Sequence, residues 1–236
     1  MKVSVVFCVF GLLSGGCGAK ITPEQPISPV EANVILRIYV VRHGEAYRNI
    51  PHPADTPEEK LDSLPPRGLQ QAATAGRFLK DKGVVAVIAS PTGRTRQTTD
   101  AIGQALGLTR HYLEDKAFAP LREGMTPEGK PVSWPWRQEQ WKAGRDPRPA
   151  EGESLEDGTA RAVNAIHQLT HRYLGDTIVI VSHGEICATL LGQTQNTPLC
   201  DRYQLHDVPT GSISEIVITD AGWHLMSKGL VPPSEK

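Results

Sequence analysis

Two short segments of this chain place a histidine directly after an apolar run of the kind found in buried strands. Val34 to Val41 is followed by Arg42-His43-Gly44, and Thr177 to Val181 is followed by Ser182-His183-Gly184. In an α/β protein the carboxyl ends of parallel strands form the edge at which ligands bind. The two segments therefore predict one site that contains a pair of histidines.

Arginines and glycines accompany these histidines. Arg42 precedes the first histidine, and Arg94 follows a third apolar run, Val84 to Ala89. A guanidinium binds two phosphate oxygens at once. We expect Gly44 and Gly184 at helix starts, where backbone N–H groups add donors for an anion. Such a set of positive groups suits a dianionic phosphoryl group better than a single carboxylate.

This combination predicts phosphoryl transfer through a histidine. One ring nitrogen of His43 attacks phosphorus in line, while a hydrogen bond at the other nitrogen fixes the tautomer. The arginines and His183 then stabilise the charge on the transferring group, which requires no metal ion. Hydrolysis also needs a group that protonates the leaving oxygen and later activates water.

The elements that must position these residues alternate along the chain. Segments with helical spacing of apolar residues separate the apolar runs, at Gly68 to Leu79, Thr95 to Leu106 and Ser154 to Tyr173. Ser154 and Asp157 are expected to cap the last of these helices, and Ile213 to Ile218 reads as a fourth strand. The order predicts α/β architecture, with one three-layer domain over residues 34–230 and a mostly parallel sheet that carries helices on both faces.

Residues 116–150 interrupt this pattern with six prolines and three of the four tryptophans. Too few apolar residues lie between the prolines for a separate core, so we expect an insertion that covers the site as a lid or loop. Trp134, Trp136 and Trp141 are expected to pack the inner face of this insertion against the sheet, and the alternative is that they wall a substrate pocket.

The N-terminus has the regions of an export signal. Lys2 is followed by an apolar run, Val3 to Leu13, and then by small residues around Cys17. We expect residues 1–19 to be a signal peptide or a lipoprotein signal and residues 20–33 to be a linker. The protein is then exported to the periplasm or the extracellular space, with lipidated Cys17 as a membrane tether in the second case. A buried first strand is the remaining alternative.

Composition sets few further limits. The chain has 236 residues, 39% hydrophobic and 22% charged, and its net charge of −1 gives no case for nucleic acid as a partner. The six histidines besides His43 and His183 lack the shared spacing of metal ligands. Outside the signal segment, Cys187 and Cys200 either form a disulfide or remain two thiols.

The motifs resemble those of the histidine phosphatase superfamily, in its smaller branch, whose best-known member is phosphoglycerate mutase. Arg42-His43-Gly44-Glu45 is similar to the family signature, and Asn49 falls where this branch usually carries asparagine. Ser90-Pro91 with Arg94 resembles the second motif, and Ser182-His183-Gly184 resembles the third. The resemblance runs from about Leu36 to Ile218.

The resemblance implies a role for each residue. His43 is the phosphorylated nucleophile, while Arg42, Arg94 and His183 bind and stabilise the phosphoryl group, and Asn49 contacts phosphate. Glu123, in Leu121-Arg122-Glu123-Gly124, falls where the family places its proton donor. Glu114, Asp115 and Glu128 are less well aligned candidates for this donor. No cofactor is implied.

The resulting hypothesis is a phosphatase that hydrolyses phosphate monoesters of small molecules. A phosphoglycerate mutase shares the pocket, but the proline-rich loop after Asn49 does not resemble the mutase pattern. The Glu123 segment also lacks the arginine and tyrosine that usually follow this glutamate in mutases. A non-catalytic phosphate-binding module and a metal-dependent hydrolase are two further hypotheses. The intact set of His43, both arginines, His183 and a candidate acid argues against the first.

Overall fold

A computed structural model of the chain describes residues 33–108 and 112–233, which belong to one compact unit, residues 32–236. The predicted signal at 1–19, Cys17 and the predicted linker as far as residue 32 lie outside the described residues. None of the helices in the described parts of the chain is both long and apolar enough to cross a membrane.

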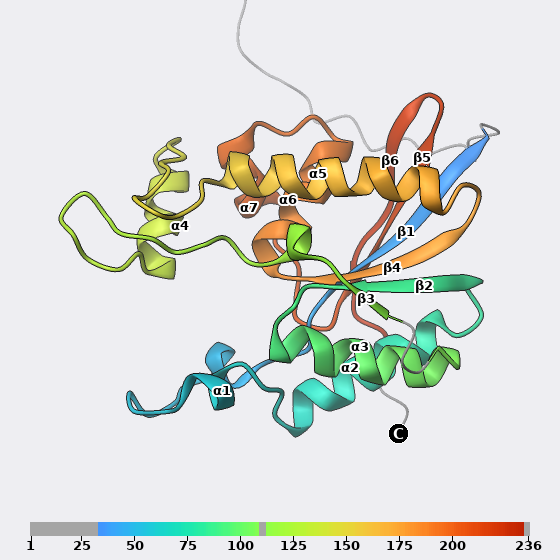
Figure 1. Cartoon of the computed structure of the whole chain (residues 1–236), viewed down its shortest axis with the longest axis horizontal. Helices are drawn as coiled ribbons and strands as arrows, with labels where there is room; N and C mark the ends of the chain where they lie inside the picture. Colours follow the sequence, from blue (N-terminus) through green and yellow to red (C-terminus); the bar gives the residue numbers. More distant parts are fainter. Residues whose placement is uncertain (1–32, 109–111, 234–236) are drawn as a thin grey trace, which may run out of the picture. The chain divides into compact units, whose positions relative to one another are not determined.

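A six-stranded sheet forms the centre of this unit, with the order β3-β2-β4-β1-β5-β6 (Figure 1). Strands β1, β2, β3 and β4 are mutually parallel, and β5 runs antiparallel to both of its neighbours. The strands are β1 Val34–Arg42, β2 Val84–Ala89, β3 Tyr112–Glu114, β4 Thr177–Ser182, β5 Ile213–Thr219 and β6 Gly222–Leu230. The sheet is therefore mixed but mostly parallel, as predicted.

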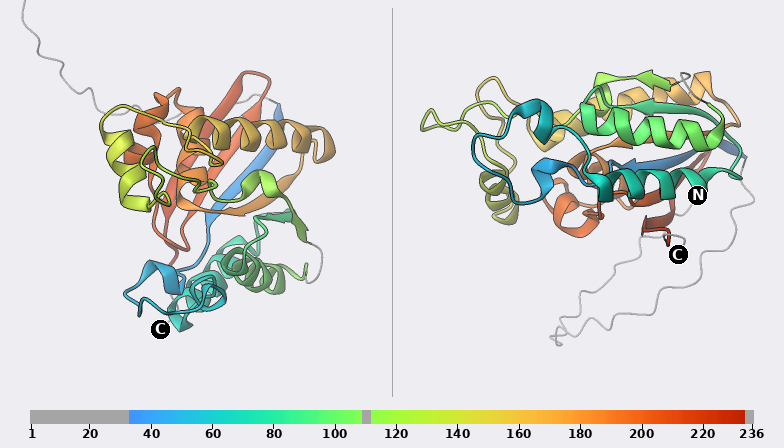
Figure 2. Two further views of the ribbon diagram at one scale, coloured as in Figure 1. Left: turned by 60° about the vertical axis from the view of Figure 1, so that its left-hand side comes forward. Right: turned by 90° about the horizontal axis from the view of Figure 1, so that it is seen from below.

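Helices cover both faces of the sheet, which gives the three predicted layers. Figures 1 and 2 show α2 with α3 on one face and α5 with α6 on the other. The helices are α1 Glu58–Leu61, α2 Pro66–Leu79, α3 Gly93–Leu106, α4 Trp134–Lys142, α5 Leu155–Arg172, α6 Gly184–Thr194 and α7 Leu199–His206, with 3₁₀ turns η1 Tyr47–Asn49 and η2 Lys116–Phe118.

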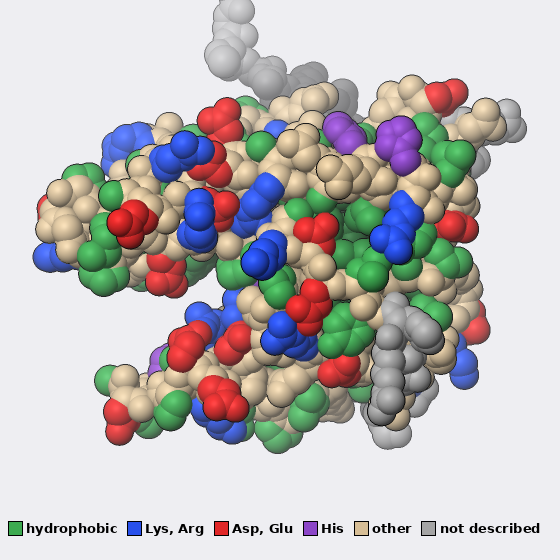
Figure 3. Space-filling model, viewed as in Figure 1, with side chains coloured by type: hydrophobic (Ala, Val, Ile, Leu, Met, Phe, Trp, Pro, Cys, Tyr) green, Lys and Arg blue, Asp and Glu red, His purple; other side chains and the backbone are tan. Residues whose placement is uncertain are grey.

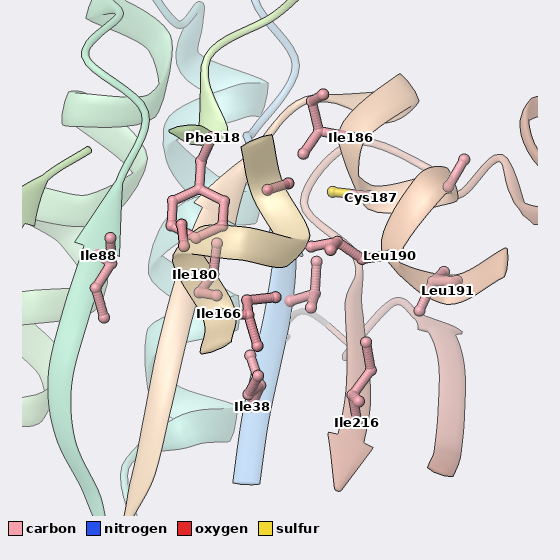
Figure 4. Close-up of a cluster of buried hydrophobic side chains, with 14 of the residues drawn as sticks. Ile38, Ile88, Phe118, Ile166, Ile180, Ile186, Cys187, Leu190, Leu191 and Ile216 are labelled. Atoms are coloured by element: carbon pink, nitrogen blue, oxygen red, sulfur yellow. The ribbon is translucent and has the colours of Figure 1, made fainter. Parts of the chain in front are cut away.

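The central strand β1 shows why the sequence pattern predicts this arrangement. Side chains alternate between the two faces of a strand. Ile38 and Val40 join the core beneath α5 and α6, while Tyr39 and Val41 join the core beneath α2 and α3. A strand buried on both faces needs a continuous apolar run, which is what the sequence has. Figure 4 shows part of the first core, with the labelled residues Ile38, Ile88, Phe118, Ile166, Ile180, Ile186, Cys187, Leu190, Leu191 and Ile216.

Helix α5 begins with the predicted capping pair. The backbone N–H of Asp157 donates to Ser154 Oγ at 3.1 Å, and the N–H of Ser154 donates to the Asp157 carboxylate at 3.0 Å. Helix α3 ends at Leu106, where the sequence predicts its end, and Gly107 follows in a left-handed conformation with φ of 70°.

Several elements are absent from the sequence prediction. Strand β3 has only three residues, too few for a pattern, and β6 lies at the edge of the sheet with most of its side chains partly exposed. Helices α1 and α7 are short, and α4 lies within the proline-rich segment 116–150. In this segment Trp141 is 2% exposed and belongs to the core, in line with the favoured packing role. Cys187 and Cys200 are free thiols.

Candidate active site

Three strand ends meet at one edge of the sheet. In the parallel register Arg42 of β1 pairs with Ser182 of β4, and Ala89 of β2 pairs with Val181. The N–H of His43 donates to the carbonyl of Ser182 at 3.0 Å. The sheet therefore brings residues from distant parts of the sequence into one row, as the two histidine segments predict.

A pocket of about 290 Å³ opens beside this row. Figure 3 shows the surface hollowed between the part that carries α4 and the part that carries α1. The pocket is lined by all seven residues predicted for the site, namely Arg42, His43, Asn49, Arg94, Glu123, His183 and Gly184.

His43 is buried, and its hydrogen bonds define its tautomer. Nδ1 lies 2.7 Å from the carbonyl oxygen of Gly44, which only accepts, so Nδ1 carries the proton. Nε2 is then unprotonated and accepts from Arg94 Nε at 3.2 Å. This is the form in which a histidine nitrogen attacks phosphorus.

The second histidine makes a complementary set of bonds. Nδ1 of His183 accepts from Arg94 Nη2 at 2.9 Å, so the proton of the neutral ring is on Nε2, which donates to Ser90 Oγ at 2.7 Å. The ring centroids of His43 and His183 are 5.2 Å apart. Arg94 therefore bridges the two histidines and aligns both rings.

Burial lowers the pKa of His43 and of His183 well below the ordinary value of 6.5, and the guanidinium of Arg94 lowers both further. A buried ring beside a fixed cation resists a second positive charge. Both histidines are therefore neutral at neutral pH, which leaves a lone pair on Nε2 of His43.

A carboxylate orients each of the two arginines. Asp62 pairs with the Nη1 of Arg94 and also accepts from the N–H of Gly93, where α3 begins, at 2.6 Å. Asp207 accepts from Arg42 at 2.9 Å. Charged hydrogen bonds of this kind fix a guanidinium in position. Neither aspartate was predicted, because both lie in loops without a periodic pattern.

The two glycines differ in their roles. Gly184 begins α6, as predicted, and a Cβ there would lie 3.0 Å from the Cζ of Arg42, so a larger residue would press against the guanidinium. The prediction for Gly44 is wrong, because no helix begins there and its N–H donates to Thr98 Oγ1 at 3.0 Å. Gly44 is required because a Cβ would collide with the carbonyl of Gly68.

Asn49 and Glu123 complete the predicted set. The Oδ1 of Asn49 accepts from the N–H of Ala46 at 2.9 Å, which holds the side chain at the end of η1 on the pocket wall. Glu123 is exposed, on the irregular segment between η2 and α4. The alternative donors Glu114, Asp115 and Glu128 do not line this pocket.

Three further charged residues line the pocket and were not predicted, namely Arg48, Arg137 and Glu185. Arg48 precedes Asn49 in the sequence, and Glu185 follows Gly184. Their position next to predicted site residues could therefore have identified both as residues of the pocket. Arg137 lies in α4, where no motif or period marks it. Trp134 also lines the pocket and is 40% exposed, so this tryptophan matches the alternative prediction of a residue in the pocket wall.

The fold and this arrangement of side chains place the protein among α/β proteins whose strand ends carry a pocket with paired histidines. The family model of the histidine phosphatase superfamily (branch 1) matches residues 38–230. Because this match spans most of the chain, the protein belongs to that superfamily, as the motifs predicted.

A curated relative and several solved structures are similar to this chain over most of its length. A probable phosphoglycerate mutase of Yersinia pestis is 27% identical over 199 residues, which cover 80% of this chain and 88% of the relative. A mycobacterial glucosyl-3-phosphoglycerate phosphatase has a TM-score of 0.63 at 19% identity, covering 80% of this chain and 97% of its own. A phosphoserine phosphatase of Entamoeba histolytica has a TM-score of 0.66 at 20% identity. The match covers 83% of this chain and 98% of the phosphoserine phosphatase. At these identities the structures establish the fold.

Proposed function

We propose that this protein is a phosphatase that hydrolyses phosphate monoesters of small molecules through a phosphohistidine on His43. The observation that carries the proposal is the hydrogen bonding of His43, whose protonated Nδ1 and unprotonated Nε2 are fixed by Gly44 and Arg94. A tautomer locked in this way is prepared for nucleophilic attack.

In the first step Nε2 of His43 attacks phosphorus, so an N–P bond forms and the ester P–O bond breaks. Arg42, Arg94 and His183 stabilise the charge on the transferring phosphoryl group. Glu123, in its protonated form, gives its proton to the leaving oxygen, and the alcohol departs.

In the second step a water molecule attacks phosphorus, and the carboxylate of Glu123 accepts the proton that the water loses. The N–P bond breaks, the electron pair returns to Nε2 of His43, and inorganic phosphate leaves. Glu123 is then protonated again and the cycle closes.

A phosphoglycerate mutase is the second candidate, because the curated relatives that match this chain include probable mutases. A mutase returns the phosphoryl group to the bound product instead of giving it to water. The proline-rich loop after Asn49 and the sequence after Glu123 favour the phosphatase.

The test is a panel of phosphate esters, including 4-nitrophenyl phosphate, phosphoserine and 3-phosphoglycerate, with release of inorganic phosphate as the readout and excess chelator in a parallel series. We expect turnover of several esters, unchanged by the chelator. Conversion of 3-phosphoglycerate to its isomer without phosphate release would favour the mutase. No turnover of any ester would overturn the proposal.

We further propose that the protein acts outside the cytoplasm, because residues 1–19 have the regions of an export signal. Expression of the full chain in a bacterial host, followed by fractionation, should place it in the periplasm or in the membrane fraction. A Cys17→Ser variant should then leave the membrane fraction if Cys17 is lipidated. Retention of the uncleaved chain in the cytoplasm would contradict export.

A further inference from the structure

The segment Leu121 to Gly124, which carries Glu123, lies outside the helices and strands and needs support from elsewhere. Gly124 has a φ of 67°, and a Cβ there would collide with the carbonyl of Ala150. Glycine is therefore required at this turn. The turn alone does not hold the preceding residues in place, because no strand or helix ladder includes them.

Arg137 of α4 supplies much of this support. Its Nη2 donates to the carbonyl of Arg122 at 2.5 Å and to the carbonyl of Glu123 at 3.2 Å. Its Nη1 donates to the carbonyl of Glu153 at 2.8 Å. A single guanidinium thus holds the backbone of the proposed proton donor and of the residue before it.

Glu185 holds the same segment from the side of α6. Its Oε1 accepts from the N–H of Leu121 at 3.3 Å, and its side chain is buried two residues after His183. The segment is thus held at the N–H of Leu121 by a carboxylate and at two carbonyls by a guanidinium. Glu153 adds a second carboxylate at the N–H of Arg122, at 3.0 Å, and a backbone N–H at its carbonyl, also at 3.0 Å. The buried carboxylate of Glu185 and the guanidinium both line the pocket.

The charge state of Arg137 argues for a purpose beyond packing. The residue is 4% exposed, and burial lowers its pKa, which nearby carboxylates, Glu185 first, offset only in part. Within the described residues, the hydrogen bonds of its guanidinium go to backbone carbonyls. A buried cation whose partners are neutral carbonyls carries a large desolvation cost. An apolar side chain would fill the same space at lower cost, but would not fix the two carbonyls.

We propose that Arg137 is a positioning residue that acts through Glu123, by holding the proton donor at the wall of the pocket that the histidine pair also lines. The inference rests on the proposed phosphatase chemistry and adds to it a residue from α4, outside the signature motifs. Glu185 holds the other end of the same segment.

This role has a kinetic signature that a general loss of structure lacks. The ratio kcat/KM reports the steps up to formation of the phosphohistidine. An alkyl phosphate needs protonation of its leaving oxygen in those steps, whereas 4-nitrophenolate leaves without a proton. A displaced Glu123 therefore slows alkyl phosphates much more than 4-nitrophenyl phosphate.

The experiment compares Arg137→Gln with Arg145→Gln, a matched exposed arginine just after α4 that bonds through its side chain to Gln140 Oε1. For Arg137→Gln we expect kcat/KM to fall at least about 10-fold on an alkyl phosphate that the wild type hydrolyses, and less than about 3-fold on 4-nitrophenyl phosphate. The Arg145→Gln variant should match the wild type on both.

A double-mutant cycle completes the test. In a Glu123→Gln background, Arg137→Gln should cause no further loss on the alkyl phosphate, because the group through which it acts is gone. Equal losses on the two substrates, or an additive loss in this background, would overturn the inference. If Arg137→Gln does not fold, Arg137→Lys serves the same comparison. Failure of the proposed function would give a different result from failure of this inference. In that case the wild type and His43→Ala would turn over both esters at the same rate.

Discussion

The pocket wall has two parts that are built by different means. In the strand-end part, His43, Arg94 and His183 are buried at the ends of neighbouring strands or at the start of α3, and the sheet register sets their spacing. In the Glu123 part, the carboxylate is exposed, and the backbone of the irregular segment that carries it is held in part by side-chain bonds from Arg137 and Glu185. The proposed phosphoryl site therefore depends on the backbone of the sheet, while the position of the proposed proton donor depends on a few side chains.

Removal of the nucleophile should have the largest effect. We expect His43→Ala to lower kcat at least about 10⁴-fold on every ester, because no other group forms the covalent intermediate. The matched control is His52→Ala, whose exposed ring bonds to the carbonyl of Ile50 outside the pocket. Steady-state rates of phosphate release measure both, and residual turnover above about 1% in His43→Ala would contradict the role.

The strand-end part should also be sensitive to a change that keeps the charge. Lysine lacks the planar fork through which two different nitrogens of Arg94 donate to the two histidines. For Arg94→Lys we expect a loss of about 10²–10³-fold in kcat/KM, independent of the leaving group. Rates on aryl and alkyl phosphates, with the exposed Arg96→Lys as control, test this. A loss confined to alkyl phosphates would show that Arg94 serves the leaving group instead of the phosphoryl group.

Changes in the Glu123 part, in contrast, should have effects that depend on the leaving group. Glu123→Gln removes the proton but keeps the shape, so kcat/KM should fall about 10²-fold or more on alkyl phosphates and much less on 4-nitrophenyl phosphate. Glu128→Gln, an exposed neighbour on the same segment, is the control. If Glu128→Gln and not Glu123→Gln showed this dependence, the proton donor would be reassigned.

The smallest expected effect is on stability. The unfolded chain protonates His43 and His183 near pH 6.5, whereas both pKa values are well below this in the folded protein. The unfolded state then binds more protons, so the free energy of unfolding falls as the pH decreases below 6.5. The slope is up to about 1.4 kcal/mol per pH unit for each ring.

Urea unfolding between about pH 5.5 and 7.5 measures this slope in the wild type and in His43→Ala. The variant should lose the contribution of one proton. Identical slopes in the wild type and His43→Ala would show that folding does not lower the pKa of His43.

The sequence predicts the strand-end part well because two strong regularities coincide there. A run such as Val34 to Val41 has one interpretation, a strand buried on both faces, and the residue that follows must lie at the ligand edge. The family motifs then assign His43, Arg94 and His183. The prediction for Gly44 was wrong because the sequence alone does not distinguish a glycine that begins a helix from one that allows another backbone to approach. Here the approaching backbone is that of Gly68.

The Glu123 part was predicted only incompletely, for a physical reason. Glu123 itself was found through its motif, but Arg137 lies in a segment where no period of apolar residues fixes the backbone. Its partners are carbonyls distant in sequence. The same holds for Asp62, which pairs with Arg94 from a loop. Such contacts depend on the path of irregular segments, and residue type alone does not specify that path.

A rapid-quench search for phosphohistidine tests the proposed mechanism most directly. The wild type is mixed with a phosphate ester labelled at phosphorus, quenched in base within milliseconds, and the protein-bound label is then tested for lability in acid. We predict acid-labile phosphate on the wild type, mapped to His43, and none on His43→Ala. Turnover by the wild type with no protein-bound phosphate at any time, or label that persists in His43→Ala, would contradict a phosphohistidine on His43.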